Sequence, residues 1–312
     1  MFELNDDKMK KVCAKIIRAF VVVLAKLPLK VHYFFGDILS WFIKNVVRYR
    51  SGVVWMNISR SFPEMKHWQL KQIYNDFYRH LGEIFAEALW FGGSNYKRLN
   101  NQGIVTVKNP EVVSDAFETS PSLTVLCSHC GNWEILGGFY GYVTKDGFKP
   151  SFGEENLTVV YKKLSSEVSD RFFAANRVAV LEGDFPNAII ESKNILRFSI
   201  EHRGDKRIYG YPVDQGPYKG MSHHDMGIFL NQQTYAMIGS VGVACKLSHA
   251  VLYLKCKHVA RGKYEWEFIL ICPDASAMSP DDIMKEYYRL LEEEIRETPH
   301  NWLWTHNRWK MS

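Results

Sequence analysis

Residues 123–138 read Leu123-Thr-Val-Leu-Cys-Ser-His-Cys-Gly-Asn-Trp-Glu-Ile-Leu-Gly-Gly138 and predict a buried strand that leads into a helix. The first five residues are apolar and short, as a buried parallel strand requires. Gly131 and Asn132 then supply a flexible turn and a helix-capping side chain. His129 therefore lies at the carboxyl end of a strand, where open α/β sheets bind their ligands.

Strand-like and helical runs alternate on both sides of this junction. The expected strands cover residues 104–107, 123–127, 157–161, 207–211, 251–255 and 264–271. The expected helices cover residues 66–90, 111–118, 133–143, 165–177, 186–200, 236–247 and 280–297. This alternation predicts an α/β fold with a mostly parallel sheet flanked by helices.

Composition favours one catalytic domain in a reducing compartment. The chain has 312 residues, of which 46% are hydrophobic, enough for one large core, and it contains no repeated or low-complexity segment. The cysteines are too few for a secreted disulfide scaffold and fall mostly in apolar runs. We expect free thiols at Cys13, Cys127, Cys130, Cys245, Cys256 and Cys272.

The first 50 residues carry an excess of positive charge. They hold ten Lys or Arg against four Asp or Glu, a surplus of six that leaves the rest of the chain at minus one out of the total of +5. Basic and apolar residues recur at helical spacing on opposite faces, which predicts a basic amphipathic helix. The basic face comprises Lys8, Lys11, Lys15 and Arg18, and the apolar face comprises Ile16, Ile17, Phe20, Val21 and Leu24.

This amphipathic segment is too short to predict a transmembrane helix. A span needs about 20 largely apolar residues, whereas the charge-free run here is only Ala19 to Ala25, and the run from Ile38 to Val47 contains Lys44. We therefore expect peripheral or monotopic attachment to an anionic membrane surface through residues 1–50, with a catalytic domain at 51–312. A helical hairpin packed on its own domain is the alternative. No cleavable signal peptide is apparent.

His129 and Glu134 together suggest general-base chemistry. A neutral histidine can take a proton from an alcohol as it attacks an acyl carbon, and a nearby carboxylate fixes the tautomer and stabilises the imidazolium. Such a reaction needs no serine or cysteine intermediate. The alternative is a structural histidine that caps the helix or hydrogen-bonds in the core.

Motifs along the whole chain are similar to those of the lipid A biosynthesis acyltransferases. That family carries a His, four intervening residues and an acid, as in His129-Cys-Gly-Asn-Trp-Glu134. The other matching segments are Asn57-Ile-Ser-Arg-Ser-Phe-Pro-Glu64, His80-Leu81 with Glu87, Tyr161-Lys162 with Arg177, Asp214-Gln215, and the ending from Pro299 to Lys310. Two segments depart from the family pattern: Lys162-Lys163 replaces Arg-Pro, and Phe229-Leu-Asn-Gln-Gln-Thr234 replaces a Phe-Phe-Gly segment.

The resemblance implies a function for these residues. Family members move a fatty acyl chain from acyl carrier protein to a lipid hydroxyl at the cytoplasmic face of the bacterial inner membrane. It implies His129 as the base and Glu134 as the acid that orients it, without a metal, a diffusible cofactor or a nucleic-acid partner. Substrate contacts are expected from Arg177, Lys162, Arg171, Asp214, Gln215 and Gly131.

These substrate contacts have separate expected roles. The cations Arg177, Lys162 and Arg171 could hold a phosphate of the donor or of the lipid, and Arg177 or backbone N–H groups near Gly131 could stabilise an oxyanion. The Asp214-Gln215 pair follows another predicted strand and could position the acceptor or brace His129. Alternatively, the cations form a solvated face and the Asp-Gln-Gly-Pro segment is only a turn.

Other functions remain open from the sequence. The acceptor could be a lipid A precursor, a lysophospholipid or an aminolipid. Cys127-Ser-His-Cys130 has the spacing of a thiol oxidoreductase, or with His129 of a partial zinc site, but neither explains Glu134. A non-enzymatic membrane-binding protein would use only the basic N-terminus. His223, His224 and Asp225 give a weak metal signal, and the aromatic tail suits either a membrane interface or the core.

Overall fold

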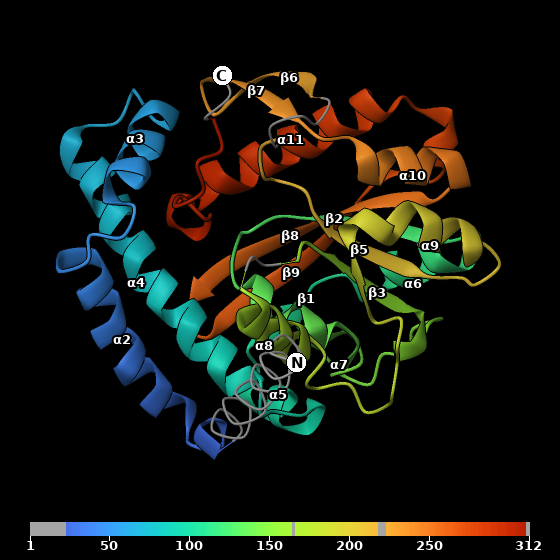
Figure 1. Cartoon of the computed structure of the whole chain (residues 1–312), viewed down its shortest axis with the longest axis horizontal. Helices are drawn as coiled ribbons and strands as arrows, with labels where there is room; N and C mark the ends of the chain where they lie inside the picture. Colours follow the sequence, from blue (N-terminus) through green and yellow to red (C-terminus); the bar gives the residue numbers. More distant parts are fainter. Residues whose placement is uncertain (1–22, 164–165, 218–222, 310–312) are drawn as a thin grey trace, which may run out of the picture.

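The computed structural model describes residues 23–163, 166–217 and 223–309 (Figure 1). The expected basic face from Lys8 to Arg18 lies outside these residues, as do Cys13 and most of the expected apolar face. Among the described residues, no helix is long and apolar enough to cross a membrane.

Within the described residues, seven strands form one sheet in the order β1-β9-β8-β2-β5-β3-β4. Neighbouring strands are parallel except for β8 and β9, which form an antiparallel hairpin. This arrangement confirms the predicted α/β class with a mostly parallel sheet. The strands are β1 (Val105–Val107), β2 (Leu123–Cys127), β3 (Leu157–Tyr161), β4 (Ile189–Glu191), β5 (Ile208–Pro212), β8 (Ala250–Ala260) and β9 (Lys263–Cys272).

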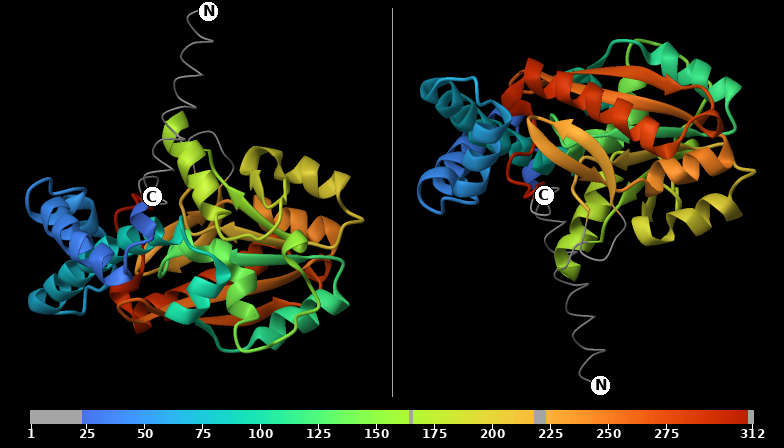
Figure 2. Two further views of the ribbon diagram at one scale, coloured as in Figure 1. Left: turned by 90° about the horizontal axis from the view of Figure 1, so that it is seen from below. Right: turned by 90° about the horizontal axis from the view of Figure 1, so that it is seen from above.

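Side-chain alternation along the strands divides the core into two layers. In β8, Val251 and Tyr253 join one cluster, whereas Leu252 and Leu254 join the other. The first layer is covered by α9 (Ile195–Glu201), α10 (Gly239–Leu247) and α11 (Pro280–Glu297), and the second by α5 (Tyr96–Gln102), α6 (Pro110–Thr119) and α7 (Phe139–Val143). Figure 2 shows helices on both faces of the sheet, which is why its central strands are apolar throughout.

One predicted helix was wrong, and one hairpin was missed. The expected helix over residues 186–200 contains strand β4 and the short α9, because only its second half keeps a helical apolar face. A two-stranded hairpin was missed, comprising β6 (His224–Phe229) and β7 (Gln232–Ala236). Its turn places Leu230 and Asn231 at positive φ without a glycine, so the usual sequence signal of a hairpin is absent.

Three helices lie at one end of the sheet (Figure 1). These are α2 (Leu29–Asn45), α3 (Ser51–Ser61) and α4 (His67–Phe91). Helices α2 and α4 cross at Gly36 and Gly82, where a Cβ built on Gly82 would lie 2.5 Å from the Gly36 carbonyl oxygen. The two backbones therefore touch, so one face of α2 is packed on the rest of the chain.

The opposite face of α2 is apolar and exposed. Phe34, Phe35 and Trp41 are 60–62% exposed, and the same surface includes Ile38 and Phe42. We call these five residues the α2 apolar face. A contiguous exposed patch of this kind on a folded chain marks an interaction surface.

A side chain at the helix crossing should destabilise the fold. We expect Gly82→Ala to lower the free energy of unfolding by about 1–3 kcal/mol, because the helices must separate to admit the methyl group. Gly52→Ala in α3 is the matched control, since nothing lies within 4 Å of its Cβ position. Urea unfolding monitored by circular dichroism measures both variants, and equal stability of the two would contradict the close crossing.

Candidate active site

The turn after β2 is held in a conformation that requires glycine. Gly131 has φ +63°, and a Cβ there would lie 2.3 Å from Sγ of Cys256. Asn132 follows as the cap of the short helix η1 (Trp133–Gly138), and its Oδ1 accepts a hydrogen bond from the Glu134 backbone N–H. The predicted strand, turn and capped helix are confirmed, and they leave His129 at the carboxyl end of β2.

The carboxylate that hydrogen-bonds His129 is Asp214. His129 Nδ1 lies 2.7 Å from Asp214 Oδ1, and the His129 backbone N–H donates to Oδ2 at 3.2 Å. Asp214 follows β5, which pairs with β2 so that Cys127 is opposite Pro212. The expected alternative in which Asp214 braces His129 is therefore what the structure contains.

Asp214 accepts a third hydrogen bond, which comes from the C-terminal segment. The indole Nε1 of Trp302 donates to Oδ2 at 2.8 Å. Burial alone would raise the pKa of Asp214, but attraction to His129 and these hydrogen bonds lower it to about 2. Burial likewise lowers the pKa of His129, yet attraction to Asp214 outweighs it, so the pKa of His129 is raised. An ionised Asp214 therefore lies against a His129 ring whose basicity is increased.

The second ring nitrogen of His129 contacts Gln215. The ring is 13% exposed, and Nε2 lies 3.4 Å from Nε2 of Gln215. With Nδ1–H donated to Asp214, Nε2 carries the lone pair that accepts from the Gln215 amide. The hydrogen bond to Asp214 therefore favours the tautomer whose Nε2 can accept a proton, as general-base chemistry requires.

Glu134 does not hydrogen-bond His129, which corrects the expected His129–Glu134 pair. Its Oε1 accepts from Arg177 at 3.3 Å and from the Trp133 indole at 3.0 Å. The Trp133 ring contacts the His129 ring edge-on at 5.0 Å. Because the turn at Gly131 reverses the chain, the carboxylate faces α8 (Glu167–Arg177) and positions Arg177 beside the base.

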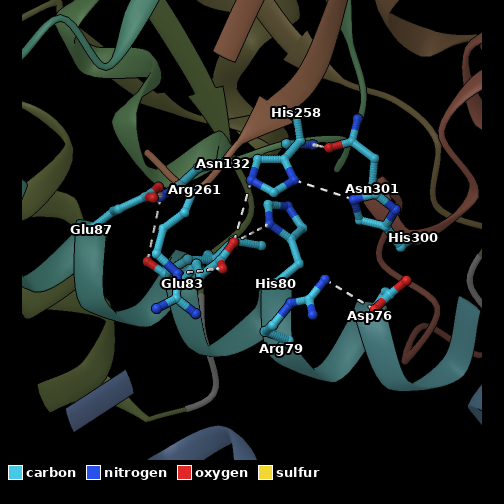
Figure 3. Close-up of polar contacts among 12 residues, drawn as sticks. Asp76, Arg79, His80, Glu83, Glu87, Asn132, His258, Arg261, His300 and Asn301 are labelled. Carbon is cyan, nitrogen blue, oxygen red and sulfur yellow. Dashed lines mark hydrogen bonds and ion pairs between the residues drawn. The ribbon is translucent and has the colours of Figure 1, made fainter. Parts of the chain in front are cut away.

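The Gly131 N–H group is already engaged, which corrects its expected role as an oxyanion donor. It donates to Asn301 Oδ1 at 2.9 Å and to the Asn301 backbone carbonyl at 3.0 Å. On the other side of the turn, Asn132 Nδ2 donates to Glu87 Oε2 at 2.8 Å. Figure 3 shows Glu87 and Asn301 approaching the turn from α4 and from the C-terminal segment.

The remaining predicted residues take different positions. Lys162 is exposed just beyond β3. Arg171 lies on α8, where its side chain is outside the described atoms. Cys127 and Cys130 are buried free thiols, and burial raises the pKa of both. A reactive cysteine needs a lowered pKa, so the structure argues against the oxidoreductase alternative.

The aromatic tail belongs to the core. Trp302, Trp304 and Trp309 are at most 7% exposed, so the expected alternative of core packing is the one observed. Sequence reasoning missed Asn301 and Trp302 as residues that hold the site. Their only signal was membership of the segment from Pro299 to Lys310, which matches the family ending without indicating what its residues contact.

Comparison with known proteins identifies the family. A profile of the bacterial lipid A biosynthesis acyltransferases matches residues 7–311. The chain belongs to this family. A search of curated proteins finds no significant match. Membership makes the chain an acyltransferase of the lipid A type, and it agrees with the resemblance of the motif around His129.

Replacing Asp214 should change the pH dependence of this lipid A-type acyltransferase. With His129 as general base, its raised pKa would place the acid limb of the rate profile above the ordinary histidine range, because a base must be deprotonated to act. In Asp214→Asn we expect the limb to move to lower pH and the rate to fall on the order of 100-fold. Initial rates of acyl transfer between pH 5 and pH 9 measure both effects.

Asp205→Asn provides the matched control for this experiment. Asp205 also hydrogen-bonds a histidine, His202, at 2.7 Å, but it is 55% exposed and lies outside the site. Its profile should equal that of the unaltered enzyme. An unmoved acid limb in Asp214→Asn would contradict the pairing of Asp214 with the catalytic base.

Proposed function

We infer that this protein transfers a fatty acyl chain from acyl carrier protein to a hydroxyl or amine of a membrane lipid, with His129 as general base. The observation that carries the proposal is the 2.7 Å hydrogen bond from His129 Nδ1 to buried Asp214, which leaves Nε2 as the proton acceptor. In the family to which the chain belongs, the natural acceptor class is a lipid A precursor.

The reaction proceeds in one proton-coupled displacement. His129 Nε2 removes the proton of the acceptor as its oxygen or nitrogen attacks the thioester carbonyl carbon. The new acyl bond forms, the C–S bond breaks, and the thiol of the carrier leaves with the proton that His129 held. Asp214 keeps the ring in one tautomer and balances the imidazolium, so no covalent enzyme intermediate is required.

Arg177 is the cation best placed to serve this reaction. Glu134 holds it at 3.3 Å, and its side chain remains 21% exposed. A guanidinium so positioned binds a phosphate of the donor arm or the lipid headgroup, or stabilises the oxyanion of the attacked thioester. Lys162, which is exposed just beyond β3, would extend the same basic surface, and Arg171 belongs to α8, which ends at Arg177. Glu134 thus acts through Arg177 as a positioning residue.

The α2 apolar face supports attachment at the cytoplasmic face of the inner membrane. Phe34, Phe35 and Trp41 point away from α4 and are more than half exposed. Lys30 is exposed in the first turn of α2, where it would meet anionic headgroups. The helix would lie in the interface while its glycine face stays packed on the enzyme.

Removal of the base should abolish transfer. We expect His129→Ala to lower the rate by a factor on the order of 100 to 10,000. The measurement is transfer from acyl carrier protein to a lipid A precursor, together with mass spectrometry of lipids from cells with and without the protein. Those lipid profiles also distinguish a lipid A precursor from a lysophospholipid or an aminolipid.

The thiols serve as the control for this assignment. Cys127→Ser with Cys130→Ser should leave transfer largely unchanged in folded protein, because neither thiol contacts the reacting atoms. Full activity of the His129 variant would refute the general base, whereas a folded but inactive double serine variant would favour thiol chemistry.

Charged substitutions on the α2 apolar face should weaken membrane binding. We expect Phe35→Glu with Trp41→Glu to reduce binding on the order of 100-fold, because two aromatic side chains no longer enter the interface. Flotation with vesicles containing anionic phospholipid measures this in the full-length chain. Leu196→Glu is the control: it is 48% exposed on α9, across the sheet from α2. Equal flotation of both variants would exclude this face as the attachment site.

A further inference from the structure

A cluster of potential metal ligands lies behind the turn that carries His129. His80 and Glu83 come from one face of α4, and His258 comes from β8 (Figure 3). Their ligand atoms lie within 4.8 Å of one another. This cluster, which we call the His80 cluster, takes no part in the acyl-transfer mechanism described above.

The spacing suits a tetrahedral metal ion. Glu83 Oε2 lies 3.4 Å from His80 Nδ1 and 3.3 Å from His258 Nε2. Zinc bonds of about 2.0–2.1 Å separate tetrahedral ligand atoms by about 3.3–3.4 Å. Two imidazoles and one carboxylate form a common zinc donor set that leaves one coordination position for water.

Burial leaves the cluster short of hydrogen-bond partners. The exposed fractions are 2% for His80 and 4% for Glu83. Among the described residues, Nε2 of His258, the atom that lies near Glu83 Oε2, has no partner in hydrogen-bond geometry.

An outer residue orients one of the ligands. His258 Nδ1 lies 3.2 Å from His300 Nε2, within hydrogen-bond distance. When His258 donates this proton, the lone pair of its Nε2 faces the Glu83 carboxylate, and a cation between them would satisfy both groups. A histidine ligand whose second nitrogen is hydrogen-bonded is the usual arrangement in metal sites.

The surrounding charges accommodate a divalent ion. Arg261 donates to Glu83 Oε1 at 2.8 Å, which leaves Oε2 for the metal. The same guanidinium forms two hydrogen bonds with Asp37 at 2.7 and 3.0 Å. Two carboxylates thus share one positive charge, and the local charge remains negative.

We propose that His80, Glu83 and His258 bind a zinc ion that braces the turn carrying His129. Glu87, one helical turn after Glu83, accepts the hydrogen bond of Asn132, and Asn301, next to His300, accepts that of Gly131. The ion joins α4 to β8 and, through His300, to the C-terminal segment. It is structural, because none of its ligands contacts His129.

The test is zinc binding by the full-length protein after treatment with a chelator. Isothermal titration should give one tight equivalent of Zn²⁺ and none of Mg²⁺, and Zn²⁺ should raise the melting temperature. We expect His80→Ala and His258→Gln each to weaken binding by at least about 100-fold, and His300→Gln by about 10-fold as an outer residue. His224→Gln is the matched control, since His224 is bonded to Asp281 at 2.9 Å outside the cluster.

Each outcome decides the proposal. Circular dichroism establishes whether each variant is folded. If His80→Ala does not fold, the milder His300→Gln variant still tests the proposal. Absence of a tight equivalent in the unaltered protein would overturn the proposal, as would undiminished binding in both His258→Gln and His300→Gln. Zinc binding is measured independently of acyl transfer, so failure of this proposal can be distinguished from failure of the proposed reaction.

Discussion

The buried carboxylate of Asp214 joins three separate parts of the chain. It accepts from the His129 ring and backbone after β2, and from the Trp302 indole in the C-terminal segment, while it belongs to the loop after β5. An ionised group this deeply buried is tolerated only with such partners. The same bonds that satisfy the charge therefore fix the direction of the His129 ring.

The turn beside this carboxylate is held from both sides. Gly131 and Asn132 donate to Asn301 and Glu87, which come from the C-terminal segment and from α4. The positive φ of Gly131 makes that double attachment sterically accessible. Packing at the helix crossing supports α4 in turn, so the geometry of the reacting group depends on contacts well outside the site.

The local sequence pattern was sufficient to predict most of the fold. The central strands are continuous apolar runs, and Gly131 with Asn132 indicates the turn after β2. The α/β class predicted from this pattern was confirmed. The proximity of Asp214 to His129 was also expected, because both follow strands at the same edge. Strand β4 and the β6–β7 hairpin were missed, since one is three residues long and the other turns without glycine.

The spacing of residues along the chain suggested the wrong carboxylate as the hydrogen-bond partner of His129. Glu134 is five residues from His129 and was the natural candidate, but the turn sends it to Arg177. The His80 cluster was equally hidden, because His80 and His258 are brought together only by the packing of α4 against β8. Contacts between such distant residues depend on tertiary structure, which cannot be read from a single sequence.

The attachment of Gly131 to Asn301 spans 170 positions in the chain. During synthesis, the strand bearing His129 leaves the ribosome long before Asn301 and Trp302 exist. A polypeptide terminated prematurely before them would contain His129, Asp214 and the whole sheet, yet lack the two side chains that contact the Gly131 turn and the buried carboxylate. The turn would thus gain its last attachment only once the distal segment has docked.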